Sequence, residues 1–188
     1  MKGFTLLEVL ITMGISVAVG ALLVVIIVNT IGISTKESSK LSEGLNINDA
    51  LYQVRNNIKN SSGVAVSYID GSTTYTSSVT QLVLKIASID ASNNFIANTY
   101  DYFVFFLDQN KLRFKTFPNV LSSRKAQNQI FSTLVDSLKF QYLNSANPPL
   151  EVTPSSALKV RMSITLKQKT GANFETTTAT SEANLRND

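Results

Sequence analysis

The sequence predicts an α+β protein, in which a long N-terminal helix, apolar in its first half and amphipathic in its second, packs on an antiparallel β-sheet head. Three observations predict it. Residues 9–28 form a run of 20 uncharged and mostly apolar residues. Residues 36–59 carry apolar side chains at helical spacing. From residue 64 onward, apolar and polar residues alternate in short segments separated by turn residues, as expected of strands.

The apolar run is long enough to cross a lipid bilayer. A helix of 20 residues spans ~30 Å, which is about the thickness of the hydrocarbon core. Glu8 lies just before this run, and the next charged residue along the chain is Lys36. Residues 4–33 are therefore expected to form one hydrophobic helix that carries a carboxylate near its start.

Two ordinary interpretations of this segment leave Glu8 unexplained. In a secretory signal peptide, Ala18-Val19-Gly20 would supply the small residues of a cleavage site, but Glu8 would lie inside the apolar core and residues 21–33 stay apolar. In a plain membrane anchor, Glu8 would be tolerated near the boundary, because the cost of an acid falls from roughly 2.5–3.5 kcal/mol at the helix centre toward the ends. A plain anchor gives no role to Glu8 or to the short basic leader that ends in Gly3.

A third interpretation explains both features. Met1-Lys2-Gly3 followed by Phe4-Thr5-Leu6-Leu7-Glu8 resembles the class III signal peptide of the type IV pilin superfamily. This family includes major pilins, minor pilins and the pseudopilins of type II secretion. The match comprises a basic leader, a Gly before the cleavage point, a Phe after it, and a Glu four residues beyond that Phe. The leader of three residues is short for the family.

The resemblance implies specific roles for these residues. A prepilin peptidase would cut between Gly3 and Phe4, so that residues 1–3 are a leader peptide, and the new amino group of Phe4 would be N-methylated. Glu8 would pair with the terminal amino group of a neighbouring subunit during filament assembly. Electrostatics fit this role, because an α-amino group is largely cationic at neutral pH and a buried acid is far less costly when it is paired. A helix N-terminus also favours a nearby acid by about 0.3–1 kcal/mol, and that alternative would act within one subunit.

The resemblance thus implies a structural subunit, a minor pilin or pseudopilin of a type IV pilus or a related type II secretion filament. It would begin as a single-pass protein of the cytoplasmic (inner) membrane, with its head outside the cytoplasm, and then enter the filament. The implied partners are other pilin or pseudopilin subunits, the prepilin peptidase and the inner-membrane assembly platform. We expect no enzymatic activity and no cofactor. The alternative is a single-pass membrane-anchored binding protein that presents a β domain, as a DNA-uptake or adhesion receptor would.

Composition excludes several kinds of site. The 188 residues include no histidine and no cysteine, which excludes a Ser-His-Asp triad, a Cys-His pair, His or Cys metal ligands and disulfide bonds. Asp90, Asn93 and Asn94 lie close together, but they lack the ligand spacing and the bidentate Glu of an EF-hand. We therefore expect a polar turn there.

Basic residues gather in two parts of the head, and the net charge is +4. No acid occurs between residues 111 and 125. Nucleic-acid phosphates are one class of partner for such clusters. We favour a solvated face on each of two alternating strands, because the total charge is modest. The first cluster comprises Lys111, Arg113, Lys115, Arg124 and Lys125, and the second comprises Lys159, Arg161, Lys167 and Lys169.

The remaining elements follow from periodicity. Residues 34–60 are expected to continue the helix as an amphipathic segment, and Ser61-Ser62-Gly63 should end it. Residues 61–188 should form the β-rich head, with a hairpin turn at 108–110 and a further turn at 147–149. The apolar face of the helix should comprise Leu41, Leu45, Leu51, Val54 and Ile58. The expected strands are 64–69, 82–86, 100–107, 111–117, 138–143 and 158–167.

Overall fold

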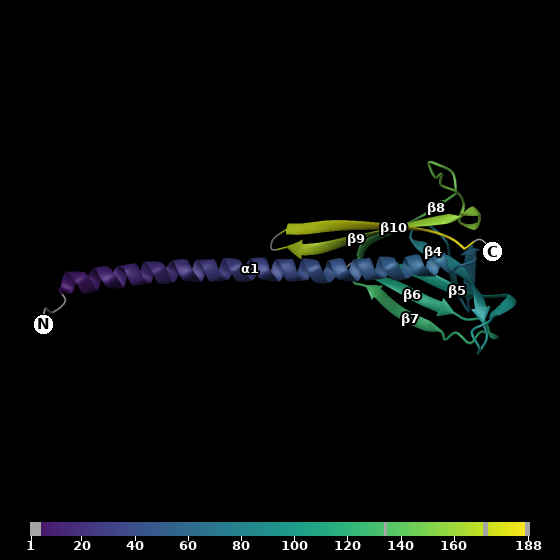
Figure 1. The fold of residues 1–188 in the computed structure, drawn as a ribbon, viewed down its shortest axis with the longest axis horizontal. Coiled ribbons are helices and arrows are strands. Elements are labelled where there is room, and N and C mark those ends of the chain that lie inside the picture. The colour runs from purple at the N-terminus through teal and green to yellow at the C-terminus, as the bar shows by residue number, and fades with distance from the viewer. Residues whose placement is uncertain (1–4, 134, 171–172, 187–188) are drawn as a thin grey trace. The chain divides into compact units, whose positions relative to one another are not determined.

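The computed structural model describes the backbone of residues 5–133, 135–170 and 173–186, and their side chains except those of residues 32–46, 168–170 and 173. A long helix precedes a series of strands (Figure 1). The elements are α1 (Leu6–Lys59), β1 (Gly63–Val64), β2 (Ser67–Asp70), β3 (Thr73–Thr76), β4 (Gln81–Ile89), β5 (Phe95–Asp108), β6 (Lys111–Phe117), β7 (Gln127–Ser132), β8 (Val135–Leu143), the 3-10 helix η1 (Pro154–Ser156), β9 (Lys159–Thr170) and β10 (Asn173–Asn184).

The chain divides into two compact units after Gly44. The first unit holds the N-terminal part of α1. The second unit, Leu45–Asp188, holds the last part of α1 and the β-sheet head. The helix ends at Lys59, and Asn60 separates it from the predicted stop at Ser61-Ser62-Gly63.

In the described part of the head, the strands form three antiparallel sheets, which confirms the predicted α+β class. The largest has the strand order β1-β4-β5-β6-β7, the second has the order β10-β9-β8, and β2 pairs with β3 in a hairpin. Every strand pair is antiparallel.

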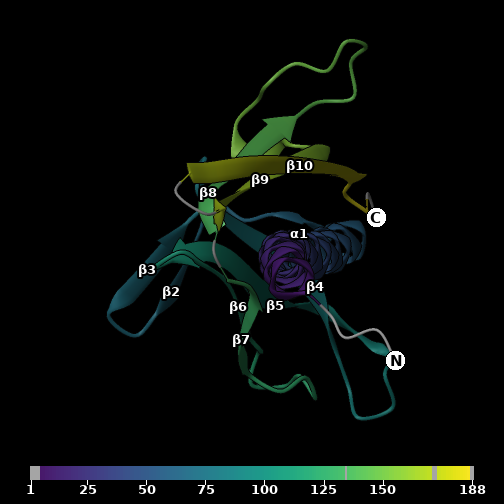
Figure 2. The same cartoon turned by 90° about the vertical axis from the view of Figure 1, so that its left-hand side faces the viewer.

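The main core lies around the last part of α1. Within the second unit, this helical segment lies between the three-stranded and five-stranded sheets (Figures 1 and 2). Leu51, Val54 and Ile58 are buried, as their spacing predicts. Leu41 and Leu45 lie outside the described side chains. The helix also buries Ile47 and Ala50, and the strands contribute residues such as Leu84, Phe105, Phe140 and Ile164.

A second, smaller core covers the opposite face of the five-stranded sheet. Val83 and Val104 have no exposed surface there, and Tyr75 of β3 packs against them. The ring of Tyr68 on β2 lies 4.5 Å from that of Tyr102 and 4.8 Å from that of Phe117, measured between centroids. The β2–β3 hairpin is therefore held on the sheet by aromatic contacts.

Five of the six predicted strands are confirmed, and each lies within or largely within β4, β5, β6, β8 or β9. The predicted hairpin at 108–110 is also confirmed. Gln109 and Asn110 both have positive φ, 46° and 63°, as a type I′ turn requires. The turn residues 147–149 lie between β8 and β9, as predicted.

The single strand predicted over 64–69 is wrong. β1 ends at Val64, where it pairs with β4, and β2 begins at Ser67 and pairs with β3. Between them, the Ala65 N–H donates to the Val83 carbonyl and the Val66 carbonyl accepts from the Ser77 N–H. The chain therefore leaves the edge of one sheet at this point and starts the hairpin that covers its other face.

Three strands have no sequence-based prediction. They are β3 (TTYT), β7 (QNQIFS) and β10 (NFETTTATSEAN). Each is short of large apolar residues, so the alternation that marks a half-buried strand is missing. Pairing with a neighbouring strand fixes them instead.

Candidate functional site

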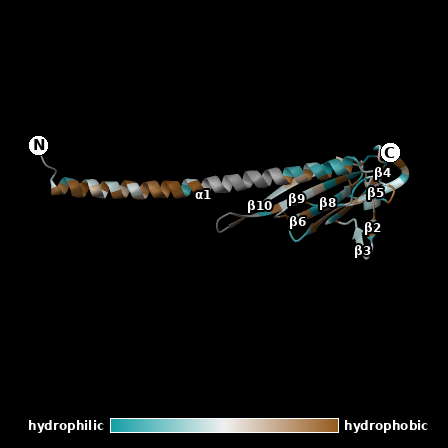
Figure 3. Cartoon of the chain, turned by 90° about the horizontal axis from the view of Figure 1, so that it is seen from below, coloured by the Kyte–Doolittle hydropathy of each residue, from teal (hydrophilic) through white to brown (hydrophobic). Residues whose placement is uncertain are grey.

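The apolar part of α1 is the most distinctive surface of the chain. Leu6–Ile31 is the one helical segment in the described part of the structure that is long and apolar enough to cross a membrane. Its side chains are exposed along the whole segment, and Leu6 and Val17 are 82% and 74% exposed. Figure 3 shows the resulting apolar band. By its length and composition, this segment could span a membrane.

The hydroxyl groups in this segment are satisfied by the helix itself. Thr12 donates to the Val9 carbonyl over 2.9 Å, and Ser16 donates to the Thr12 carbonyl over 2.8 Å. Thr30 donates to the Ile26 carbonyl over 2.8 Å. Because each hydroxyl proton is bonded internally, these residues add little cost in an apolar environment.

Glu8 forms a reciprocal cap at the start of the helix. One carboxylate oxygen, Oε2, accepts hydrogen bonds from the backbone N–H and the hydroxyl of Thr5, both over 3.0 Å. The Glu8 N–H in turn donates to the Thr5 hydroxyl over 3.3 Å. This is a capping box, and the motif Thr-x-x-Glu before an apolar run could have predicted it. Thr5 is neutral, so these bonds leave the negative charge of Glu8 in place.

The predicted cleavage point, Gly3–Phe4, lies outside the described residues. Of the residues to which the resemblance assigns a role, the structure describes Glu8 but not Gly3 or Phe4.

The glycines of the apolar segment have no steric role within the chain. A Cβ atom added to Gly14 or Gly20 would meet no atom within 4 Å. Each glycine lowers helix stability by roughly 1 kcal/mol relative to Ala. With Ser16, Gly20 forms a small-xxx-small pair, which is a surface that a neighbouring helix can approach closely.

The structure does not gather the first basic cluster into one free surface. Lys111, Arg113 and Lys115 alternate with the buried residues of β6, while Arg124 and Lys125 lie in the loop before β7. The Arg113 Nε atom lies 2.6 Å from Asp108 Oδ2, and Lys115 Nζ donates to the Tyr75 hydroxyl over 2.8 Å.

The second basic set is also engaged within the head. Lys159 and Arg161 on β9 both form ion pairs with Glu182 on β10, over 3.0 and 2.7 Å. Lys167 Nζ lies 5.0 Å from the centroid of the Phe174 ring. The side chain of Lys169 lies outside the described residues. These contacts reduce the free positive charge available to an anionic partner.

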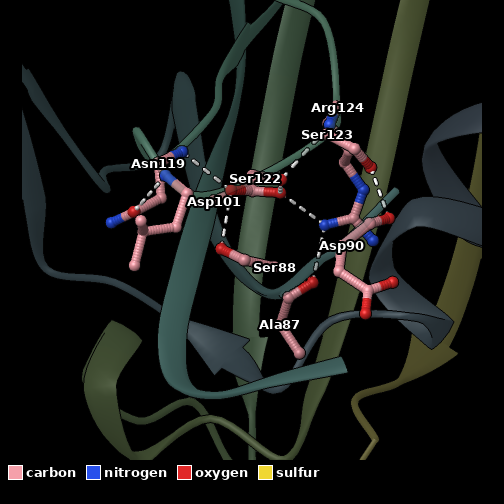
Figure 4. Close-up of polar contacts among 9 residues, drawn as sticks. Ala87, Ser88, Asp90, Asp101, Asn119, Ser122, Ser123 and Arg124 are labelled. Carbon is pink, nitrogen blue, oxygen red and sulfur yellow. Dashed lines mark hydrogen bonds and ion pairs between the residues drawn. The ribbon is translucent and has the colours of Figure 1, made fainter. Parts of the chain in front are cut away.

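Arg124 forms an ion pair with a buried carboxylate (Figure 4). Its Nη1 atom lies 2.6 Å from Oδ2 of Asp101, whose side chain has no exposed surface. The same nitrogen donates to the Ala87 carbonyl over 2.6 Å. The Asp101 carboxylate also accepts hydrogen bonds from Ser88, Ser122 and the Asn119 N–H, over 2.7–2.8 Å.

This network fixes the loop between β6 and β7 to the end of the β4–β5 pair. Desolvation acts to raise the pKa of Asp101, but the hydrogen bonds from Asn119, Ser88, Arg124 and Ser122 together outweigh it and hold the pKa below its ordinary value. The carboxylate therefore stays charged at neutral pH, and Arg124 compensates it. The contact joins residues that are 23 positions apart, so no local pattern in the sequence could reveal it.

The Asp90 turn is confirmed. Oδ1 of Asp90 accepts the N–H groups of Ser92 and Asn94 over 2.8 and 2.9 Å, and Asn93 has a φ of 63°. These bonds hold the pKa of Asp90 below its ordinary value, with the Asn94 N–H as the main cause. The carboxylate thus closes the turn between β4 and β5. Among the described residues, no three His, Cys, Asp or Glu side chains form a group that could hold a metal ion.

A shallow groove of about 320 Å³ lies beside the same end of the head. Ser62, Lys85, Phe95 and Tyr100 contribute to its walls, and Lys85 Nζ lies 3.7 Å from the centroid of the Tyr100 ring. Its lining contains no Asp or Glu.

No protein-family model matches the chain, and no curated protein sequence matches it significantly.

Proposed function

We propose that this protein is a non-enzymatic filament subunit of the type IV pilin superfamily, a minor pilin or pseudopilin, which assembles through its N-terminal helix. The observation that carries the proposal is an acidic residue, Glu8, at the start of a 26-residue apolar helix whose side chains are exposed throughout. The leader-like residues before it and the β-rich head after it fit the same proposal.

Two features of the helix support assembly with other helices. Gly14 and Gly20 fill no tight space within the chain, although each glycine lowers helix stability. A neighbouring helix that approaches closely at these positions would give them a role. The hydroxyl groups of Thr12, Ser16 and Thr30 are bonded internally, so they suit both a membrane and an apolar filament core.

The capping box gives the Glu8 carboxylate a partner within its own chain before assembly. In a single chain, Thr5 supplies two hydrogen bonds to the carboxylate but no positive charge. Hydrogen bonds alone compensate a buried charge only partly. The terminal amino group of a neighbouring subunit would supply the missing cation, so that the cap holds the carboxylate in place and the neighbour neutralises it.

Membrane insertion is the step before assembly under this proposal. The apolar segment would first anchor the protein in the inner membrane, with the head outside the cytoplasm. A binding protein with a permanent anchor would share this step. A nucleic-acid receptor gains little support, because Arg113, Arg124, Lys159 and Arg161 all form ion pairs within the head.

Co-expression with a prepilin peptidase separates the filament subunit from a permanently anchored protein. The proposal predicts cleavage after Gly3, a mass loss of about 0.3 kDa, and one added methyl group, all measured on the intact chain by mass spectrometry. A Gly3→Val variant serves as the uncleaved control. A chain that keeps residues 1–3, in cells that process other prepilins, would contradict the proposal.

A further inference from the structure

The groove beside the β4–β5 pair owes its shape to a bulge in β5. On β4, Ala87 and Ile89 are separated by one residue. Their partners on β5, Tyr100 and Phe95, are separated by four, so residues 96–99 bulge out of the regular pairing and form one wall of the groove. Bulges are common beside functional sites, where they change the direction of a strand and of its side chains. The groove volume of about 320 Å³ lies at the lower end of the range for small-molecule sites.

Lys85 is the cation of this groove, and its backbone is held on both sides. β1 pairs with β4 at Gly63 and Lys85, and β5 pairs with β4 at Tyr102 and Lys85. The Ser62 N–H, directly before β1, donates to the Lys85 carbonyl over 2.8 Å. The strand segment that carries the ammonium group is therefore in place before any ligand binds, which lowers the entropic cost of binding.

Within the described residues, no Asp or Glu forms an ion pair with Lys85 or lines the groove. Arg113, Arg124 and Lys159, in contrast, all face carboxylates. The Lys85 Nζ atom lies 3.7 Å from the centroid of the Tyr100 ring. This cation–π contact stabilises the ammonium group but adds no negative charge. The positive charge of Lys85 is therefore available to an anion that enters the groove.

The other side chains of the lining suit a flat apolar group. Phe95 is 62% exposed and stands at the edge of the bulge. Ile96, Ala97 and Ala87 add further apolar surface to the walls. Aromatic side chains bind flat rings through stacked or edge-to-face contacts. Small-molecule sites typically combine such apolar walls with a few polar groups that fix the orientation of the ligand.

We propose that this groove binds a small molecule in which one carboxylate is joined to an aromatic or similarly flat apolar group. The carboxylate binds the Lys85 ammonium group, and the flat group packs against Phe95. One lysine compensates one negative charge, which favours a carboxylate over a phosphate monoester, because the monoester carries about −1.5 to −2 charges at pH 7. This inference does not depend on the proposed function, because the groove belongs wholly to the unit that contains the head.

Benzoate, benzamide and acetate test the two parts of the ligand separately. Each is titrated into the full-length protein in an uncharged detergent, and the amide chemical shifts of residues 95–100 are followed by NMR. Benzoate should shift these amides to saturation. Benzamide keeps the ring but lacks the charge, and acetate keeps the charge but lacks the ring. Each should therefore bind about tenfold more weakly than benzoate.

Variants of Lys85 test the source of the charge. Lys85→Met removes the ammonium group but keeps an unbranched side chain, so it should weaken benzoate binding about tenfold and leave benzamide binding unchanged. Lys85→Arg retains the charge and should retain benzoate binding. The matched control is Lys139→Met, which removes an exposed lysine of β8 outside the groove lining. It should bind benzoate as the wild type does, and amide shifts away from the groove verify the fold of each variant.

Phe95→Ala tests the apolar wall. It should weaken benzoate binding about fivefold without changing the affinity for acetate, because only the ring contact is lost. Equal affinities for benzoate and either of the other two probes would overturn the proposal. So would an unchanged benzoate affinity in Lys85→Met, an equal loss in Lys139→Met, or benzoate-induced shifts confined to residues outside the groove.

Discussion

The side chains of Thr5 and Glu8 bond each other at the start of α1. The Thr5 hydroxyl donates to Glu8 Oε2 over 3.0 Å, and it accepts the Glu8 N–H over 3.3 Å. Glu8 thus has one partner within its own chain and, under the proposed function, a second partner in a neighbouring subunit. The two roles differ in what they need from Glu8, because the cap needs an acceptor oxygen and the pairing needs a negative charge.

Thr5→Ala should loosen the start of the helix without removing the charge of Glu8. Loss of an N-cap side chain typically costs about 0.5–2 kcal/mol of helix stability. In detergent, we expect faster amide hydrogen exchange in residues 6–9 and no change in the middle of the segment. The matched control is Thr12→Ala, which also removes an internally bonded hydroxyl but not a cap. Unchanged exchange at residues 6–9 would show that the cap does not stabilise the helix.

Arg124→Ala should strongly destabilise the head, since it leaves the Asp101 carboxylate buried without its cation. Removal of one partner of a buried ion pair typically costs about 3–5 kcal/mol. Because Arg124 is partly exposed, we expect a decrease of about 3 kcal/mol in the free energy of unfolding, measured by urea titration of the full chain in detergent.

The control for Arg124 is Arg113→Ala. Arg113 and its partner Asp108 are both partly exposed, at 27% and 42%, so the loss should be below about 1 kcal/mol. Equal losses in the two variants would contradict the role assigned to the buried network.

The Asp101 carboxylate should also make the stability of the head depend on pH. Its pKa is lower in the folded chain than its ordinary value of 3.8. Its contribution to stability is therefore complete above the ordinary pKa and is lost as the pH falls through the folded pKa. We expect the urea midpoint of the wild type to decrease as the pH is lowered below about 4. The Asp101→Asn variant should have a lower urea midpoint than the wild type at neutral pH, and its midpoint should decline less steeply as the pH falls. A decline as steep as that of the wild type would assign the pH dependence to other carboxylates.

The Gly20→Leu variant should distinguish the stability of the isolated helix from its ability to pack against a neighbouring helix. A Cβ atom added at Gly20 meets no atom within 4 Å, and leucine has a higher helix propensity than glycine, so helix content in detergent should not fall. Incorporation into filaments should decrease, because a bulky residue prevents close approach of a neighbouring helix. Val24→Leu adds one methylene to an already large exposed side chain and is the control. Full incorporation of Gly20→Leu would exclude a close helix contact at this position.

Sequence patterns predicted the elements in which local chemistry and burial agree. The alternation of Leu112, Phe114 and Thr116 with basic residues marks β6, because one face of the strand is buried. Asn110 marks the hairpin, since it tolerates positive φ. The apolar spacing of Leu51, Val54 and Ile58 marks the packed face of α1.

Other features depend on contacts that no local pattern contains. β10 lacks apolar alternation and is a strand because β9 lies beside it. Arg124 looked like part of a basic surface, but Asp101, far away in sequence, determines its position. The prediction over 64–69 failed because residues with strand propensity can leave one sheet and enter another without a strong turn signal.

The most direct test of the central claim is the Glu8→Gln variant, measured as the fraction of the protein recovered in sheared filaments from cells that assemble the wild type. The glutamine amide retains an acceptor oxygen for Thr5 but removes the charge. If a neighbouring amino group neutralises Glu8, incorporation should fall at least tenfold, or by about 1.4 kcal/mol in assembly free energy. Thr5→Ala should reduce incorporation much less. Wild-type incorporation of Glu8→Gln would contradict the claim and would leave Glu8 as a helix cap alone.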